Sequence, residues 1–385
     1  MAEALRIAIF SAQYLPHIGG VESYTRNLAV TLIGMGHKPV VVTCNCDSLP
    51  SREVTDDGIE VVRLPCFPLL GGRFPVSRFG RAYRSMLRAL DGECFDGVLV
   101  NTRFYPHSIC GLRFARRHHL TPIVLDHGSQ YLTFGNAVLD VFVRAYEHII
   151  TSIAKRFHPV FCGVSKKSLD WLRQFGISGI DILPNAIDVD AYCSNASNRD
   201  FRAELGVGTD SVLACFVGRL IPEKGIDSLL AAMKQLNETP VKLVVAGDGP
   251  LRELMDSTPE NVSYVGPLRP ADVSSLLQAA DVLCLPTRSE GFCTTLLESS
   301  ACGTPAIIPL VGGVDEVFGE EDCGFLLDGC APDQIAAAIR VACASKAETR
   351  QKNFLVRSNY VGVAFPLTGV CRGFVSSFGY CFLQK

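Results

Sequence analysis

Two glutamates, Glu290 and Glu298, stand eight positions apart, and Gly291 and Phe292 directly follow the first of them. Ionised carboxylates accept hydrogen bonds through two oxygens, so each can bind a pair of neighbouring hydroxyl groups. We therefore predict that Glu290 binds a transferred hexose and that Glu298 binds a ribose. The alternative is that Glu290 caps a helix and that Glu298 is a solvated charge, and this motif alone does not exclude it.

The segments around Glu290 predict where it lies. Residues 281–286 form an apolar run typical of a buried parallel strand, and residues 294–301 are typical of a helix. Glu290 then lies on a strand-to-helix loop, at the carboxyl end of a strand, where ligands bind in doubly wound sheets. The backbone amides of Phe292 and Thr294 would point from the helix start toward an anionic or hydroxylated ligand.

A second loop carries cations. Arg219 and Lys224 lie between the apolar run 211–216 and the helical pattern 226–236. Arginine offers a planar fork and lysine a compact charge, so both can bind a diphosphate. We predict that these two cations take the role at the diphosphate that a magnesium ion has in other enzymes. The alternative is a surface arginine and a lysine at a helix end.

In the order and spacing of these motifs the chain resembles the retaining glycosyltransferases of family 4. That family has the α/β GT-B architecture, in which two Rossmann-like doubly wound domains face each other across a cleft. The resemblance covers roughly residues 5–330. Its matching features, besides those above, are Gly19-Gly20, His127-Gly128, Leu183-Pro184-Asn185-Ala186-Ile187-Asp188, Ala246-Gly247-Asp248-Gly249-Pro250 and Val265-Gly266.

The resemblance implies transfer of a hexosyl group from a nucleoside-diphosphate sugar to an acceptor hydroxyl, with retention of anomeric configuration. The expected acceptor is a glycan or a lipid-linked molecule in cell-surface polysaccharide or glycolipid biosynthesis. The donor is a co-substrate, and we predict no other cofactor, no metal and no nucleic-acid partner. Two alternatives remain: a sugar-nucleotide epimerase, and a protein that binds nucleotide sugars without catalysis.

The resemblance also implies residue roles. Arg219, Lys224 and the helix amides would stabilise the leaving oxygen, Glu290 would orient the hexose, and His127 would contact the transferred sugar rather than act as a base. The expected catalytic residues are Arg219, Lys224, Glu290 and His127. The expected donor-binding residues are Gly19, Gly20, Arg219, Lys224, Gly266, Glu290, Phe292, Thr294 and Glu298.

Alternating apolar strands and amphipathic helices predict two α/β domains. The first, residues 1–188, would bind the acceptor, and the second, residues 189–350, would bind the nucleotide sugar. A polar segment without periodicity, residues 185–199, is the predicted linker. The tail, residues 351–385, departs from the family, whose last helix crosses back to the first domain. Residues 358–385 contain four glycines, Pro366 and no acidic residue, which is poor helix material, so we interpret them as an aberrant terminus. Their effect on domain closure keeps the non-catalytic alternative open.

Composition agrees with a cytoplasmic enzyme. The chain has 385 residues, of which 48% are hydrophobic and 19% charged, with a formal net charge of −3. The first apolar run starts almost at Met1 and no uninterrupted one reaches 18 residues, so we expect neither a signal peptide nor a membrane span. The sixteen cysteines show no metal-ligand spacing and are predicted to be small buried residues in a reducing compartment.

One segment raises the question of a membrane surface. Arg78, Arg81, Arg84 and Arg88 fall on one side of a predicted helix, and apolar residues that include Phe79, Tyr83 and Leu90 fall on the other. One interpretation is an ordinary surface helix. The other is that the arginines rest on anionic lipid headgroups at the cytoplasmic face of a membrane, near a lipid-linked acceptor. In that case charge alone would attract the helix to the bilayer.

Overall fold

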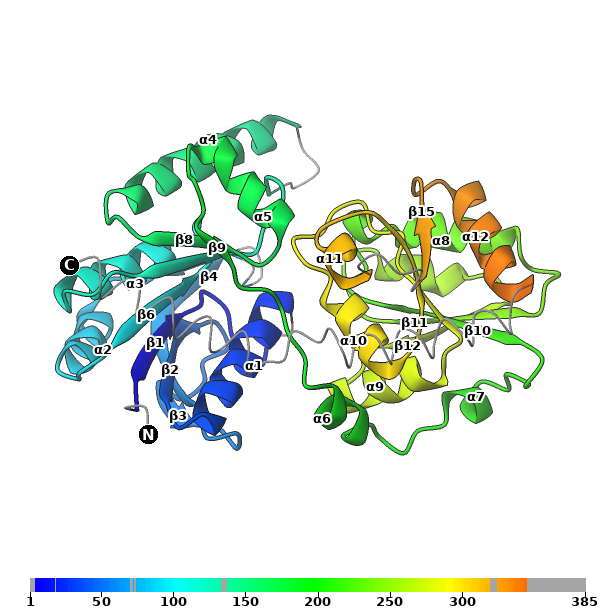
Figure 1. Ribbon diagram of the computed structural model, residues 1–385, viewed down its shortest axis with the longest axis horizontal. Coiled ribbons are helices and arrows are strands. Elements are labelled where there is room, and N and C mark those ends of the chain that lie inside the picture. The colour runs from blue at the N-terminus through cyan, green and yellow to red at the C-terminus, as the bar shows by residue number, and fades with distance from the viewer. Residues whose placement is uncertain are drawn as a thin grey trace. The chain divides into compact units, whose positions relative to one another are not determined.

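The computed structural model describes residues 4–17, 19–69, 72, 74–132, 137–318 and 324–344. The chain forms two compact units, one ending at Ala186 and the next beginning at Ile187 (Figure 1). The division falls within the predicted linker, close to the predicted boundary after residue 188. The predicted aberrant tail, residues 351–385, lies outside the described residues.

Unit 1 is built on a sheet in the order β3-β4-β2-β1-β6-β7-β8-β9, with β5 paired to β4. All pairs are parallel except β3 with β4 and β4 with β5. The strands are β1 (Arg6–Phe10), β2 (Lys38–Asn45), β3 (Arg52–Val54), β4 (Glu60–Leu69), β5 (Phe74–Ser77), β6 (Gly97–Asn101), β7 (Ile123–Asp126), β8 (Val160–Gly163) and β9 (Asp181–Ile182). The central strands are buried apolar runs because helices cover both faces of a parallel sheet.

The helices of unit 1 lie on the two faces of this sheet. They are α1 (Gly20–Gly34), α2 (Arg81–Asp91), α3 (Pro106–Arg117), α4 (Ala137–Lys155), α5 (Lys166–Trp171) and the 3₁₀ turn η1 (Leu172–Phe175). Side chains of α2, α3 and α4 share one buried cluster with β1, β2, β4, β6 and β7. These three helices therefore cover one face of the sheet, and α1 covers the other (Figure 1).

Unit 2 is built on a parallel sheet in the order β12-β11-β10-β13-β14-β15. Its strands are β10 (Val212–Val217), β11 (Val241–Ala246), β12 (Val262–Gly266), β13 (Val282–Cys284), β14 (Ala306–Pro309) and β15 (Gly324–Leu327). Its helices are α6 (Val189–Ser194), α7 (Phe201–Glu204), α8 (Ile226–Lys234), α9 (Pro270–Ala279), α10 (Thr294–Cys302), α11 (Val314–Phe318) and α12 (Pro332–Ala344), with 3₁₀ turns η2 (Pro222–Lys224) and η3 (Arg252–Ser257). One apolar core joins the sheet to these helices.

The predicted α/β class and the strand-helix alternation are confirmed, with differences in the linker, in β4 and in the basic helix. The linker, predicted to be irregular, contains helix α6. Asp188 caps the start of this helix, because its carboxylate accepts a hydrogen bond from the amide of Ala191 at 2.9 Å. Residues 58–64 form a mostly apolar run typical of a strand, but β4 continues to Leu69, because β5 pairs with its second half. The antiparallel strands β3 and β5 at the margin of the sheet are short, so no long apolar run in the sequence indicates them.

The predicted basic helix is shorter than expected. α2 begins at Arg81, so Arg78 and Phe79 precede it, and Phe79 is 70% exposed instead of buried. The guanidinium of Arg78 lies over the ring of Phe67, 5.8 Å from its centroid. Within α2 the prediction is correct, because Tyr83 and Leu90 are buried and the arginines are exposed.

The prediction for the cysteines is confirmed only in part. Cys94 is exposed, and six of the thirteen described cysteines are half-buried. No disulfide joins any two of these thirteen described cysteines. Among the described residues, no helix has the length and apolar character required to cross a bilayer.

Candidate functional site

The predicted donor residues of unit 2 gather at one edge of its sheet. Arg219 and Lys224 follow β10, Gly266 ends β12, and Glu290 follows β13. β10 lies between β11 and β13, with β12 beyond β11, and the pairs are parallel. The loops at their carboxyl ends therefore meet at the edge where doubly wound sheets bind ligands.

Lys224 and Glu290 form an ion pair between the β10 and β13 loops. The ammonium group of Lys224 donates to Oε1 of Glu290, and their side chains are 18% and 11% exposed. Burial is the largest single influence on Lys224 and lowers its pKa, but the charge of Glu290, the charge of Cys293 and the hydrogen bond to Glu290 together outweigh burial, so the pKa lies above its ordinary value. The hydroxyl of Thr287, itself fully buried, lies 3.0 Å from the same carboxylate oxygen. Glu290 is thus held by two donors.

Arg288 fastens the two loops together, which sequence reasoning did not predict. Its amide donates to the carbonyl of Glu223 at 2.7 Å, and its guanidinium donates to the carbonyl of Pro222. The same guanidinium pairs with Asp227 at 3.1 Å. The only signal in the sequence is an arginine two positions before Glu290, which is too common a feature to single out.

Glycines at two positions let backbone segments approach closely. Gly225 has a φ of 68°, and a Cβ there would lie 2.1 Å from the carbonyl oxygen of Pro286. A Cβ at Gly312 would lie 2.1 Å from the carbonyl oxygen of Glu290. Gly225 joins the Lys224 loop to the Glu290 loop, and Gly312 brings the loop after β14 against Glu290. Sequence reasoning missed both.

The start of α10 is open to a ligand. The helix begins at Thr294 after Cys293, and no side chain caps it. The amides of its first turn lack intrahelical partners and carry the positive end of the helix dipole. Phe292 is buried, and Gly313 packs against its ring. The helix start can therefore receive an anionic or hydroxylated group beside Glu290.

Glu298 lies further along α10. Burial raises its pKa to about 7. Tyr192, on α6, has a buried hydroxyl with no hydrogen-bond partner among the described residues. Burial, followed by the charge of Glu298, raises the pKa of Tyr192. The predicted linker thus supplies a polar group near Glu298. This contact could not be predicted, because Tyr192 lies in a segment without periodicity.

In unit 1, His127 follows β7 at the carboxyl edge of the sheet. Its Nε2 lies 3.2 Å from Oδ1 of Asn101, whose amide nitrogen donates to Thr25 at 2.7 Å. Tyr24 packs edge-on against the imidazole, with ring centroids 5.1 Å apart. Burial lowers the pKa of His127 to about 3, so the imidazole is neutral at neutral pH. A hydrogen bond to the amide oxygen of Asn101 places the proton on Nε2 and leaves Nδ1 as an acceptor.

A buried ionic network holds the loop that carries His127. Arg103, 1% exposed, bonds Asp126 at 2.5 Å and Glu147 at 2.7 Å. Asp126 accepts from the amide of Gly128 at 3.0 Å, and Glu147 accepts from the amide of Leu132 at 2.9 Å. Both carboxylates thus tie the loop after β7 to the core, and none of this was apparent from the sequence.

Gly19 lies where the sequence predicts, between β1 and α1, whereas Gly20 is the first residue of α1. Gly19 is the extended residue before the helix, and its carbonyl accepts from the amide of Ser23 at 3.0 Å. A Cβ there would lie 2.4 Å from a carboxylate oxygen of Glu22, which is buried in the first turn. The predicted residues therefore form two groups, with Gly19, Gly20 and His127 in unit 1 and the others in unit 2.

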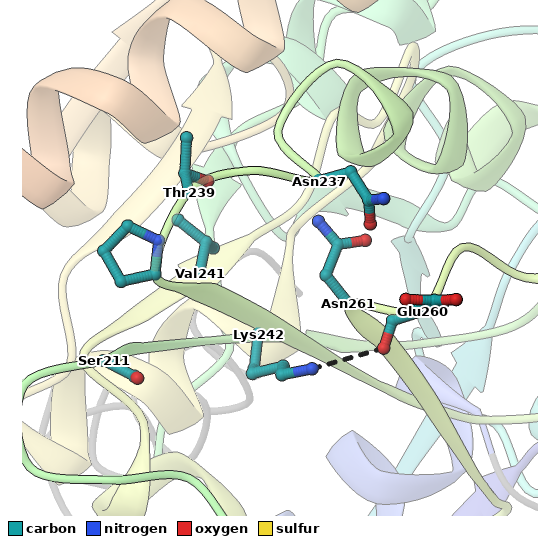
Figure 2. Close-up of a pocket in the computed structure, with 8 residues that line it drawn as sticks. Ser211, Asn237, Thr239, Val241, Lys242, Glu260 and Asn261 are labelled. Carbon is teal, nitrogen blue, oxygen red and sulfur yellow. Dashed lines mark hydrogen bonds between the residues drawn. The ribbon is translucent and has the colours of Figure 1, made fainter.

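Figure 2 shows a polar recess elsewhere in unit 2, lined by Ser211, Asn237, Lys242 and Glu260 among others. Lys242 donates to the carbonyl of Glu260 at 3.3 Å. The recess lies at the amino ends of β10, β11 and β12, opposite to the edge that binds ligands in this kind of sheet. It contains none of the predicted site residues.

Known proteins share both sequence and fold with the chain. It is 37% identical over 203 residues to a putative teichuronic acid biosynthesis glycosyltransferase of Bacillus subtilis, covering 52% of this chain and 49% of that one. It is 26% identical to the alpha-monoglucosyldiacylglycerol synthase of Acholeplasma laidlawii, covering 82% and 81%. The crystal structure of Anabaena HepE in complex with UDP-glucose matches 98% of this chain and 100% of that one, with a TM-score of 0.76 and 17% identity.

Two family models match in tandem. The model for Glycosyltransferase Family 4 matches residues 18–191, and the model for Glycosyl transferases group 1 matches residues 197–353. The two matches correspond to the two units. With both units and the GT-B relatives in agreement, the chain belongs to the family 4 glycosyltransferases of GT-B fold.

Proposed function

We propose that this glycosyltransferase moves a hexosyl group from a nucleoside-diphosphate sugar to an acceptor hydroxyl, with retention of anomeric configuration and without a metal ion. The observation that carries the proposal is the Lys224–Glu290 pair, which unites a phosphate-binding cation and a sugar-binding carboxylate at the carboxyl edge of one sheet. Arg219 lies on the same loop as Lys224, and its charge acts on Lys224.

The pairing of Lys224 with Glu290 suits this chemistry. Glu290 has a fixed orientation, so its remaining acceptor capacity can bind hexose hydroxyls. Lys224 and the exposed Arg219 provide two cations for the diphosphate, and the open start of α10 provides amide donors. As the bond between the anomeric carbon and the leaving oxygen breaks, these groups stabilise the negative charge on that oxygen.

Retention requires the acceptor to attack the face that the diphosphate leaves. The leaving oxygen then accepts the proton of the acceptor hydroxyl, and no carboxylate needs to form a covalent bond with the sugar. His127 is suited to accept a hydrogen bond from a sugar hydroxyl through Nδ1, and its pKa of about 3 makes it a weak base. This supports the sugar-contact role for His127.

Glu298 and Tyr192 are proposed to bind the ribose. A buried carboxylate whose pKa is raised is stabilised by hydroxyl groups of a ligand that donate to it, and the hydroxyl of Tyr192 has no partner within the described part of the chain. The names of the relatives support acceptors in cell-surface polymers or glycolipids: one is named a putative teichuronic acid biosynthesis glycosyltransferase and another an alpha-monoglucosyldiacylglycerol synthase. HepE, solved with UDP-glucose, supports a nucleotide-sugar donor.

A thermal-shift panel of UDP, GDP, ADP and their sugars, without metal, tests donor binding on the wild type and on Glu298→Ala. A ligand at a hundred times its dissociation constant adds about 2.7 kcal/mol of stability. We expect one nucleotide family to stabilise the wild type and the variant to lose that shift. No shift with any nucleotide would contradict donor binding.

Turnover is tested with the stabilising nucleotide sugar, a panel of lipid and glycan acceptors, and a chelator. We expect a product with the donor's anomeric configuration, seen by NMR, and equal rates with and without chelator. An inverted product would contradict retention, and loss of activity restored by magnesium would contradict metal independence. An epimerised nucleotide sugar would instead support the epimerase, and binding without turnover would support the non-catalytic alternative.

A further inference from the structure

α4 exposes an apolar stripe to solvent. Val138, Val141, Phe142 and Ile149 are 70%, 63%, 68% and 62% exposed. Their positions repeat at intervals of three, four and seven, so they lie on one side of the helix. The opposite side is buried and includes Ile150 and other residues of the unit 1 core. Single exposed apolar side chains are ordinary, but a continuous stripe along a helix indicates a binding surface.

The charged residues of α4 favour an anionic partner. Its exposed ionisable side chains are Arg144, His148 and Lys155, and Arg156 follows directly after the helix. The ammonium group of Lys155 also donates to the carbonyls of Phe175 and Gly176. Its acidic residues are less exposed, since Asp140 is half-buried and Glu147 is buried. Exposed Val, Phe and Ile flanked by basic groups are typical of helices that lie in a membrane interface.

The two neighbouring helices on the same face of the sheet continue this charge pattern (Figure 1). On α2 and α3, as on α4, every charged side chain in the exposed class is basic, whereas Asp91 on α2 is half-buried and pairs with Arg117. These residues are Arg81, Arg84 and Arg88 on α2, and Arg113, Arg116 and Arg117 on α3. Basic groups near an anionic bilayer are attracted to its negative surface, and their contributions add.

We propose that α4 is a membrane-docking helix, which inserts Val138, Val141, Phe142, Ile149 and Ile153 into the interface of an anionic phospholipid bilayer. The arginines of α2 and α3 contact the surrounding headgroups. This differs from the expectation that α2 attracts the protein by charge alone, because α4 adds apolar insertion to the charge. The partner is a bilayer rather than a protein because the stripe is wholly apolar and the exposed ionisable groups of α4 are all basic.

This inference deepens the proposed function, because a bilayer surface would present a lipid-linked acceptor. It can be tested without turnover, so that its failure and the failure of the transferase proposal are distinguishable. Donor binding by unit 2 should be unchanged in variants that remove the stripe, since α4 belongs to unit 1.

The test is co-sedimentation of the full chain with vesicles of phosphatidylcholine alone and of phosphatidylcholine mixed with phosphatidylglycerol. The variant Phe142→Asp/Ile149→Asp replaces two exposed side chains, so the fold should persist. Val341→Asp is the matched control, because Val341 is 53% exposed on α12 of unit 2. The nucleotide-induced thermal shift, measured on each protein, verifies that unit 2 is intact.

We expect the wild type and Val341→Asp to bind only the anionic vesicles, more weakly as salt rises. The double variant should bind them at least about tenfold more weakly, because each lost side chain forfeits the free energy of burying it. A Phe142→Trp variant should also show a blue shift of its emission with anionic vesicles.

Three results would overturn the proposal. The first is that the wild type does not sediment with anionic vesicles, and the second is that the double variant binds them as well as the wild type does. The third is that sedimentation velocity shows a wild-type dimer that the double variant abolishes, which would assign the stripe to a second copy of the chain.

Discussion

At the scale of single residues, the Lys224–Glu290 pair combines structural and catalytic demands. Removing one member leaves a largely buried charge without its counterion, which destabilises a protein more than loss of the pair itself. The proposed chemistry requires both charges. Stability and turnover should therefore respond differently to single and double substitutions.

We predict that Lys224→Met lowers turnover by about two to three orders of magnitude, because the variant lacks one of the positive charges that stabilise the leaving oxygen. It should also lower the urea midpoint of unfolding. Adding Glu290→Gln should recover part of that stability and none of the turnover. Lys234→Met, at an exposed position on α8, is the control and should change neither. Full recovery of turnover in the double variant would count against the roles assigned to both residues.

Glu298 should make donor affinity depend on pH. Its pKa is about 7 in the ligand-free protein, and ligand hydroxyls that donate to the carboxylate would lower it. Binding then releases a proton below pH 7, so affinity should be constant above pH 7 and fall by up to about tenfold per unit below it. Calorimetric titration with the nucleoside diphosphate measures this. In Glu298→Gln the Glu298-linked dependence should vanish, and an unchanged profile would exclude Glu298 as its source.

The same pKa has a consequence for stability with a definite sign. An acid whose pKa is raised in the folded state binds protons more tightly there than in the unfolded chain. Between its ordinary value of 4.5 and about 7, the contribution of Glu298 to stability therefore falls as pH rises. This is consistent with a binding group that is held at some cost in the absence of its ligand.

At the scale of elements, the loops that form the site were predictable as loops, whereas their mutual contacts were not. Glu290 and Lys224 could be placed because buried apolar runs precede both, and parallel strands bring their carboxyl ends to one edge. Arg288, Gly312 and Tyr192 escaped because each acts through a segment far away in the sequence. Phe79 was misplaced because its spacing fits a helix that in fact begins two positions later.

Gly225 offers a test of the contact between the two site loops. A Cβ at Gly225 would collide with the carbonyl oxygen of Pro286, whereas at Gly206, which has a similar φ of 62°, a Cβ would meet nothing within 4 Å. Gly206→Ala should therefore cost only the backbone penalty, about 1–2 kcal/mol. Gly225→Ala should cost more in urea unfolding and should also weaken nucleotide binding. Equal losses in the two variants would mean that the Pro286 contact is unimportant.

At the scale of the whole molecule, the two-domain organisation followed from the sequence because each half repeats the strand-helix alternation that fills a core of its own. The order of the strands in the sheet was harder to predict from the sequence. In unit 1, β3 and β5 pair antiparallel with β4, and no long apolar run in the sequence indicates these short strands. The family resemblance supplied what periodicity could not, namely that two such domains together make a glycosyltransferase.

Separate cores predict separate responses to a ligand. Each unit has its own apolar cluster, so differential scanning calorimetry should show two transitions rather than one. Since Arg219 and Lys224, which are proposed to bind the diphosphate, belong to unit 2, a bound nucleoside diphosphate should raise one transition and leave the other in place. Glu298→Ala should reduce that rise, while a substitution confined to α4 should not. If the nucleotide instead moves both transitions together, the two units unfold as one cooperative body and the ligand stabilises the pair.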